Sequence, residues 1–248
     1  MAQAAGRTAG ESPPLLFLDT AVLETHVYID GFNLYYGLLR GTPHKWLDLE
    51  RFCDQLLPKN DVRKIYYFTA KVDARPHDPD QPTRQLAYLH ALETLPRVEV
   101  HLGTFMSSVV SQVVVDTDPA TGRYLRASGK PVIKTDSAGA PVKVWTFKSE
   151  EKGSDVNLAA YLLRDAYQGN CACAVIVSND SDLLTPIRMA KADCGMTIGL
   201  VPPRPKGSVE LKRLADFKIE PRVHLLASSQ LPAILQTPQG TVHKPANW

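Results

Sequence analysis

Net charge, cysteine and long apolar runs are all scarce in this sequence. Its 28 Lys and Arg face 26 Asp and Glu, a net charge of only +2, which excludes a positive field over the whole molecule as the means of attracting nucleic acid. A basic surface for a phosphate backbone would have to be local. No stretch approaches the roughly 18 consecutive apolar residues of a membrane span, and the apolar patch at 15–18 is too short for the hydrophobic region of a signal peptide. These absences predict a cytoplasmic protein without membrane contact.

The four cysteines form no recognisable metal or disulfide pattern. Cys53, Cys171, Cys173 and Cys194 lie in or beside apolar stretches. The only close pair is C-x-C, with neither the second pair nor the histidine spacing of a zinc site. We interpret them as buried free thiols of a reducing compartment. With 44% hydrophobic and 22% charged residues, the composition excludes wholesale disorder, a collagen-like fibre and a disulfide-stapled miniprotein.

The two ends of the chain differ in composition from the middle. Residues 1–14 are rich in Ala, Gly, Ser and Pro, and the chain from Ser228 onward has several prolines and little apolar periodicity. We predict loosely ordered tails over 1–22 and 228–248. The 23–227 segment between them has a common length for one α/β domain.

Apolar strands alternate with amphipathic helices through the middle of the chain. The patterns predict strands over 26–30, 62–72, 98–103, 172–178 and 196–201, and helices over 81–95, 154–167 and 181–193. From about 105 to 148 the rhythm is broken by short apolar runs between the turn sequences DPATG and DSAGAP. The sequence therefore predicts an α/β fold, with a mostly parallel central sheet flanked by helices and a β-rich hairpin insertion.

Acidic residues follow two of the predicted strands. Asp30 ends HVYID, and Asp180 and Asp182 follow AVIVS. Ligands of an open parallel sheet bind beyond the carboxyl ends of its strands, so we expect these acids at one edge of the sheet. Asp155 begins a predicted helix, where it is equally explained as a helix-terminal acid, and Asp182 is equally explained as a helix cap. Asp30 at the end of an apolar strand needs a partner, solvent or a cation.

A divalent cation would resolve the repulsion within such a cluster. Two carboxylates about 4 Å apart repel by about 4 kcal/mol at an effective dielectric constant of 20. Carboxylate oxygens suit Mg²⁺ or Mn²⁺ rather than zinc. One or two such ions could deprotonate water and neutralise charge on a phosphate in transfer, so the chemistry indicated is phosphodiester hydrolysis.

Three motifs occur together in order: DGFNLYY at 30–36, EEKGSDVNLA at 150–159 and VSNDSDLL at 177–184. They resemble the NYN family, a branch of the PIN-like metal-dependent ribonucleases with a Rossmannoid fold that includes the bacterial LabA-like proteins. The resemblance extends from about His26 to Phe217 in element order. It implies a Mg- or Mn-dependent ribonuclease, expected to be an endonuclease.

The same resemblance implies particular site residues. The implied metal ligands are Asp30, Asp155, Asp180 and Asp182. Together with Asn33 they form the expected catalytic set. Ser178 belongs to the third motif as a supporting residue. The family usually has Gly where this chain has Asn179, and Asn tolerates left-handed backbone, so we expect the turn to survive.

A further acid from an early helix is usual in PIN nucleases. Either Glu150 or Glu151 could supply it here, and the sequence does not choose between them. Lys152 could hold a phosphate, pair with a carboxylate or be a solvated loop lysine. Tyr35 and Tyr36 could stack on a base or pack in the core.

The expected partner is RNA, single-stranded or structured, and a homo-oligomer is compatible with the sequence. Basic and aromatic residues interleave in the insertion, which fits a single-strand platform as well as a solvated hairpin. They are Arg123, Tyr124, Arg126, Lys130, Lys134, Lys143, Trp145, Phe147 and Lys148. A second basic run could line the same face: Arg204, Lys206, Lys212 and Arg213.

Two other interpretations of these motifs stay open. A PIN-like RNA-binding adaptor that has lost cleavage would not need the mutually repelling acids. A phosphatase of the haloacid dehalogenase type would need D-x-D-x-T after the first strand, where this chain reads D-G-F-N. The histidines His44, His77, His90 and His101 have no mutual spacing that indicates ligation.

Overall fold

A seven-stranded sheet forms the centre of the molecule. The computed structural model describes residues 22–246 and 248, so the tail predicted over 1–22 lies outside the described residues except at its last position. The strand order is β6-β3-β2-β1-β7-β8-β9, and every neighbouring pair is parallel except β3 with β6. The strands are β1 (Leu23–Asp30), β2 (Asn60–Ala70), β3 (Val98–Val113), β6 (Lys143–Lys152), β7 (Cys173–Val177), β8 (Thr197–Leu200) and β9 (Phe217–Lys218). The predicted mostly parallel α/β fold is confirmed.

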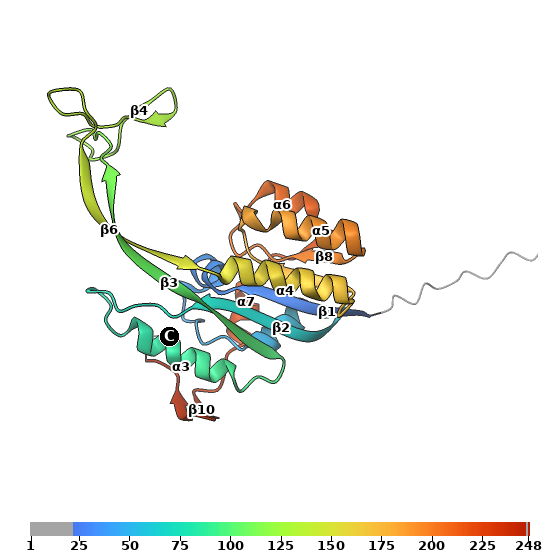
Figure 1. Ribbon diagram of the computed structural model, residues 1–248. Helices are drawn as coiled ribbons and strands as arrows, with labels where there is room; N and C mark the ends of the chain where they lie inside the picture. The colour runs from blue at the N-terminus through green and yellow to red at the C-terminus, as the bar shows by residue number, and fades with distance from the viewer. Residues whose placement is uncertain (1–21, 247) are drawn as a thin grey trace, which may run out of the picture.

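Helices cover both faces of this sheet (Figure 1). One face packs on α4 (Ser154–Gln168), α5 (Leu184–Cys194) and α6 (Val209–Leu214), and the other on α2 (Leu49–Leu56), α3 (Gln81–Leu92) and α7 (Val223–Ser228). Strand β1 alternates between the two layers: Tyr28 packs with Leu158 of α4, whereas Val27 and Ile29 pack with Phe52 of α2. The central strands read as continuous apolar runs because they are buried on both faces. No helix within the described residues is long and apolar enough to cross a membrane.

The sheet reverses its direction of growth between β1 and β7. From β1 the chain adds β2, β3 and β6 successively on one side of the sheet. After α4 it adds β7 on the other side of β1. Connections on the two sides leave the carboxyl ends of β1 and β7 in opposite directions, which opens a crevice between them. The connection after β1 begins with α1 (Gly31–Leu34), which continues into a π-helical turn, η1 (Tyr35–Leu39), before the chain reaches α2. The connection after β7 is a 3₁₀ turn, η2 (Ser181–Leu183), that leads into α5.

The predicted β-rich insertion is a long two-stranded arm that projects from the sheet (Figure 1). Strand β3 does not stop at 103 as the sequence suggested. Residues 98–103 pair with β2 in parallel, and residues 104–113 continue in the same strand to pair with β6 antiparallel. Beyond the arm lie the short strands β4 (Arg126–Ala127) and β5 (Lys130–Pro131). The arm is thus an extension of the central sheet, continuous with the edge that holds the acids.

The 228–248 segment differs from the expectation of a loosely ordered tail. Its strands β10 (Ile234–Thr237) and β11 (Gly240–His243) form a hairpin that contacts α3. The indole of Trp248 lies 6.3 Å from that of Trp46 and 5.8 Å from the ring of Tyr88, centroid to centroid. A backbone hydrogen bond also attaches the segment to the domain, since the N–H of Leu231 donates to the carbonyl of Trp46. Aromatic packing here outweighs a proline-rich composition, and the boundaries of the domain stay a prediction.

Candidate active site

Asp30 ends β1 and is 4% exposed. Its Oδ1 accepts a hydrogen bond from the backbone N–H of Asn33 at 2.9 Å, which caps α1. Its Oδ2 accepts from the side-chain amide of Asn33 at 2.5 Å and from the Ser178 hydroxyl at 3.1 Å. Burial raises the pKa of Asp30, and these hydrogen bonds oppose the rise. Asn33 and Ser178 therefore fix the direction of a carboxylate that the fold has withdrawn from water.

The third motif sits directly beside Asp30 because β7 pairs with β1. Ser178 follows β7 and accepts a hydrogen bond from the N–H of Asp180, whose own carboxylate caps η2 by accepting from the N–H of Asp182 at 3.0 Å. The N–H of Asn179 donates to the side chain of Asn33 at 3.4 Å and so joins the first motif to the third. Among the described residues Ser128 is the single non-glycine with positive φ. The turn therefore forms at Asn179 without the left-handed backbone for which Asn was expected to substitute.

Asp155 reaches the same place from the first turn of α4. Gly153, with φ of 100°, turns the chain from β6 into this helix, and Glu151 accepts from the N–H of Ser154 at 3.0 Å. A pocket of about 270 Å³ is lined by Asp30, Phe32, Asn33, Tyr36, Arg75, Phe105, Glu151, Asp155 and Asp180; we call it the acid pocket. Four carboxylates from β1, β6, α4 and the β7 loop thus share one pocket at the carboxyl ends of the strands.

The pKa of Asp155 is raised by its surroundings in this pocket. Burial and then the negative charges of Asp30, Asp180, Glu151 and Asp182 raise it from 3.8 to about 6. Asp182 itself is exposed and lines an adjoining cavity of about 350 Å³ with Asp155 and Glu151, outside the acid pocket. The structure therefore brings three of the four predicted ligands into the pocket and leaves Asp182 at its margin.

Replacing Asp155 by Asn should stabilise the metal-free protein above pH 6 and leave it unchanged near pH 4. Since folding raises this pKa from 3.8 to about 6, the ionised carboxylate costs stability. The cost grows as the pH rises through this interval and is complete above it. We expect Asp155→Asn to gain about 1–2 kcal/mol in free energy of unfolding at pH 8, after allowance for partial solvent screening. Urea unfolding in EDTA at pH 4 and pH 8 measures this.

The control for that experiment is Asp193→Asn on the exposed end of α5. A gain of equal size at both pH values, or in both variants, would contradict the assignment of Asp155 to the repelling cluster.

Register in the arm brings one of the two glutamates that the sequence left open to the acid pocket. Glu151 pairs opposite Phe105, and both line the acid pocket. Glu150 faces the other side of the ribbon, where it forms ion pairs with Lys148 and Lys152. Lys152, a candidate for holding phosphate, therefore has a carboxylate partner outside the acid pocket.

Arg75 and Phe105 were not singled out from the sequence. Arg75 lies in the loop between β2 and α3 and is the one cationic side chain among the described residues that line the acid pocket. A guanidinium is suited to a phosphate oxygen. It could have been found by applying to β2 the rule applied to β1 and β7, that residues following a parallel strand lie at the site.

Comparison with known proteins identifies the family of this chain. The family model described as the NYN domain matches residues 108–221, a range that includes Glu151, Asp155 and Asp180. The chain belongs to the NYN domain family. NYN domains are PIN-like, ribonuclease-type domains, and PIN-like nucleases generally use divalent metals. Membership indicates a nuclease-type hydrolase and suggests RNA as its substrate.

Two individual proteins are similar to this NYN chain. One is the 6-hydroxy-3-succinoylpyridine 3-monooxygenase HspA of Pseudomonas putida (strain DSM 28022 / S16), 33% identical over 258 residues, which span 93% of this chain and 77% of the relative. The other is the crystal structure of a protein of unknown function from Vibrio parahaemolyticus RIMD 2210633. It is 15% identical, with a TM-score of 0.48 over 82% of this chain and 94% of that one.

The acid pocket of the NYN domain offers the right donors for a hard cation. Carboxylate oxygens are the ligands that Mg²⁺ and Mn²⁺ prefer, and the pKa of Asp155 is raised by burial and by the negative charge of its neighbours. Within the described part of the chain, however, no three His, Cys, Asp or Glu side chains are grouped as a formed metal centre. The donor set fits in kind, and its carboxylates would have to draw closer around an ion.

Another acid on α4, Asp165, contrasts with Asp155 because its charge is compensated by hydrogen-bond donors. Asp165 is fully buried, and although burial alone would raise its pKa, hydrogen bonds from His26, Asn170, Tyr28 and Arg164 lower it well below the usual range. It lies ten residues beyond Asp155, about 15 Å along the helix axis. Asp165 is neutralised by donors, whereas Asp155 is surrounded by like charge, so the acid pocket is the one in need of a cation.

The predicted basic residues lie away from the acid pocket. Lys143 is exposed on the arm, Lys130 and Lys134 are exposed in the segment beyond it, and Arg204 and Lys206 are exposed in the loop after β8. None of these side chains lines the acid pocket. If they act, they act on parts of a substrate remote from the reacting bond.

Proposed function

We propose that this protein is a Mg²⁺- or Mn²⁺-dependent ribonuclease whose catalytic centre is the acid pocket. The observation that carries the proposal is the convergence of Asp30, Glu151, Asp155 and Asp180 in one pocket, where burial and repulsion between the carboxylates together raise the pKa of Asp155 to about 6. A cation is the simplest partner for such a set. The direct test is incubation of purified protein with labelled RNA and DNA panels, with Mn²⁺, Mg²⁺ or EDTA. Metal-dependent RNA cleavage is expected, and RNA binding without cleavage would favour the adaptor.

Each side chain has a distinct task in this mechanism. Asp30, Asp155 and Asp180 would hold the cation, with Glu151 completing the set from β6. The bound ion would activate water and neutralise charge on the phosphate. Asn33 and Ser178 keep the Asp30 carboxylate directed, as their hydrogen bonds indicate. Arg75 would contact a phosphate oxygen from the open side of the pocket.

The arm provides a track from the acid pocket for a single strand. Residues opposite each other across antiparallel strands, and those two apart along a strand, share one face. Phe105 and Glu151 at the pocket therefore share a face with Phe147 and Trp145, which pair opposite Val109 and Ser111. Phe147 and Trp145 are 74% and 76% exposed. Six residues of strand span about 20 Å, so the aromatic face leads outward from the site over a few nucleotides.

This geometry favours an unpaired strand as substrate and cleavage within it. Exposed aromatic rings stack on bases of any sequence, and a duplex does not present its bases to them. Because the face continues beyond the pocket, a strand lying on the arm would enter the acid pocket away from its end. We therefore propose an endonuclease of single-stranded segments. Its cytoplasmic location and any homo-oligomer stay predictions.

Replacing Lys130, Lys134 and Lys143 together by Ala should weaken binding of single-stranded RNA and flatten its salt dependence. Removing one phosphate contact lowers the slope of log affinity against log salt by about 0.7. Turnover at saturating RNA should change little, because these contacts are equal in the ground and transition states. Fluorescence anisotropy over a KCl series, beside cleavage kinetics, measures both.

The matched control replaces three lysines outside the arm, Lys59, Lys218 and Lys244, which changes the net charge equally. If both triple variants behave alike, the basic contact surface is on neither the arm nor the segment beyond it. In that case Arg204, Lys206, Lys212 and Arg213 become the candidates.

A second candidate function comes from the Pseudomonas relative, whose name describes oxygen insertion into a substituted pyridine. A cavity lined by aromatic side chains beside the acid pocket is the observation that favours it. Oxygen uptake with 6-hydroxy-3-succinoylpyridine and a reduced nicotinamide, with and without added flavin, tests this candidate. Substrate-dependent uptake would support it.

The phosphatase interpretation has no support in the sequence, since Phe32 occupies the place of its second Asp.

A further inference from the structure

A second cavity adjoins the acid pocket and takes no part in the mechanism above. It is lined by Gly31, Tyr35, Tyr67, Tyr88, Gln81 and Trp248, among others; we call it the ring pocket. Phe32 and Tyr36 line both this cavity and the acid pocket. The two sites are therefore separated by two aromatic side chains.

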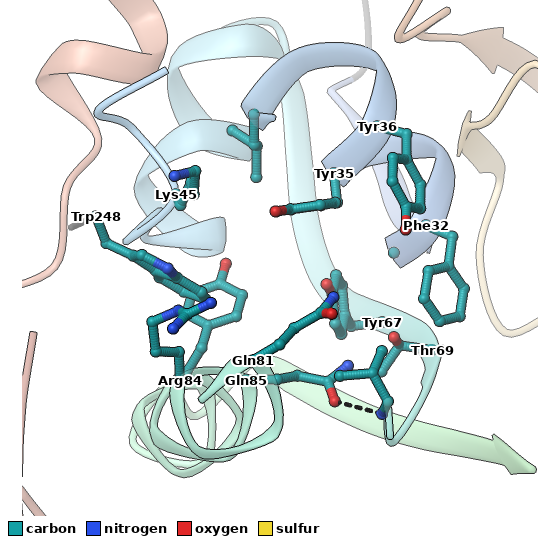
Figure 2. Close-up of a pocket in the computed structure, with 14 residues that line it drawn as sticks. Phe32, Tyr35, Tyr36, Lys45, Tyr67, Thr69, Gln81, Arg84, Gln85 and Trp248 are labelled. Atoms are coloured by element: carbon teal, nitrogen blue, oxygen red, sulfur yellow. Dashed lines mark hydrogen bonds between the residues drawn. The ribbon is translucent and has the colours of Figure 1, made fainter. Parts of the chain in front are cut away.

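The walls of the ring pocket are aromatic, with polar groups directed inward. Figure 2 shows the hydroxyl of Tyr35, the amide of Gln81 and the ring of Tyr67 turned toward the cavity. Burial raises the pKa of both tyrosines, so their hydroxyls are neutral donors at physiological pH. The amide of Gln81 can donate and accept. Such a cavity suits a flat ring that carries its own donors and acceptors.

Arg84 and Lys45 are the cationic side chains that line the ring pocket, and each is engaged in an interaction within the protein. The guanidinium of Arg84 donates to both carboxylate oxygens of Asp78 at 2.6 Å. Gln85 is held as well, since it accepts from the N–H of Val72 and donates to the carbonyl of Ala70 at 2.9 Å. Tyr35, Tyr67 and Gln81 are thus the polar groups best placed for a ligand, which favours an uncharged ring.

The size of the cavity favours one ring over a fused pair. Its volume of about 70 Å³ is room for about five waters at 10–15 Å³ each and is about half of the roughly 150 Å³ cavity that holds one benzene ring, so even a single ring would have to widen it somewhat. A fused two-ring base would require a much larger displacement of the walls. Tyr67 fixes one wall, because a Cβ at Gly31 would lie 2.7 Å from its ring.

We propose that the ring pocket binds one uncharged, six-membered nitrogen heterocycle that bears a keto or hydroxyl group. Two sources share this chemistry: a pyrimidine base of RNA and a free hydroxypyridine. If the source is RNA, the base belongs to the nucleotide beside the reacting phosphate and gives the enzyme a pyrimidine preference. That placement rests on the proposed nuclease function, whereas binding of the ring does not.

Calorimetric titration in EDTA tests ring binding without any catalysis. The probes are uridine, cytidine and 2-hydroxypyridine, with adenosine and guanosine as controls for size and phenol as the control for the ring nitrogen. We expect at least one single-ring heterocycle to bind about tenfold or more tightly than the purines and phenol. Saturable binding of none of them, or equal binding of the purine nucleosides, would overturn the proposal.

Variants locate the binding and separate the two sources. Gln81→Leu should weaken binding of the ring by about three- to tenfold, the effect of removing one hydrogen bond, while Gln168→Leu on the exposed end of α4 should not. Tyr35→Phe, which keeps the ring, gives a second measurement should Gln81→Leu fail to fold. An unchanged affinity in both variants would place the ligand elsewhere.

Mapping of cleavage sites on a mixed-sequence RNA completes the separation. If the wild type cuts beside pyrimidines and Gln81→Leu loses this preference, RNA is the source of the ring. If 2-hydroxypyridine binds and the nucleosides do not, the free ring is the ligand. Cleavage without base preference, together with no ring binding, defeats this proposal and leaves the nuclease intact. Ring binding without any cleavage supports the ring pocket and defeats the nuclease proposal.

Discussion

Asp30→Asn and Asp180→Asn should each lower RNA cleavage by about 10²–10³-fold, the scale of loss when a group that supports developing charge is removed. Both side chains line the acid pocket, and each amide takes away an anionic oxygen that a cation requires. Initial rates with labelled single-stranded RNA in Mn²⁺ measure the loss. Asp193→Asn, a conservative change on the far end of α5, should keep full activity.

Loss of activity in these variants should not come from loss of the fold. An amide at position 180 can still accept from the N–H of Asp182, and one at position 30 can still accept from the N–H of Asn33, so both helix caps survive. Removal of a charge also relieves repulsion on Asp155. In EDTA we therefore expect Asp180→Asn to melt at or above the wild-type temperature.

Added metal gives an independent measurement on the same variants. A cation that binds only the native state raises the melting temperature, and the rise grows with the logarithm of the cation concentration divided by its dissociation constant. Wild type should therefore be stabilised by Mn²⁺ far more than Asp30→Asn or Asp180→Asn. Full cleavage in either variant, or equal stabilisation by Mn²⁺ in all three proteins, would end the metal-nuclease proposal.

Much of this site could be predicted because it depends on local sequence. Asp30 and Asp180 directly follow apolar strands, and parallel strands bring their carboxyl ends to one edge whatever else the fold contains. Asp155 could be placed from the helix it begins. These three line the acid pocket, although no formed metal centre is present among the described residues.

The remainder depends on register and on long-range packing. Glu150 and Glu151 are neighbours in sequence, and a shift of one residue in the β3–β6 pairing would exchange their faces. The ring pocket is built by Tyr35, Tyr67, Tyr88 and Trp248, from four separate segments of the chain. No spacing in the sequence relates these positions. The last of them lies in a segment whose prolines indicated a tail, and its packing became visible only in three dimensions.

Replacing Trp145 and Phe147 together by Ala should weaken binding of single-stranded RNA by about 30-fold or more, since each stacked base contributes about 1–3 kcal/mol. Both rings are exposed on the face of the arm that leads to Glu151 and Phe105. Because the removed groups are neutral, the salt dependence of binding should keep its slope, unlike that of the triple lysine variant. Turnover at saturating RNA should stay near the wild-type value, since the acid pocket is untouched.

The control for this variant lies on the opposite face of the same ribbon. Val144 and Met106 are 46% and 64% exposed there, and their replacement by Ala should leave RNA affinity within about twofold, a fraction of one stacking contact. In the wild type, RNA should quench the fluorescence of Trp145, and a Trp145→Phe variant should lose that part of the signal. Equal weakening by both double variants would mean that the arm contributes through its shape rather than through a stacking face. An unchanged affinity in both would remove the arm from RNA binding altogether.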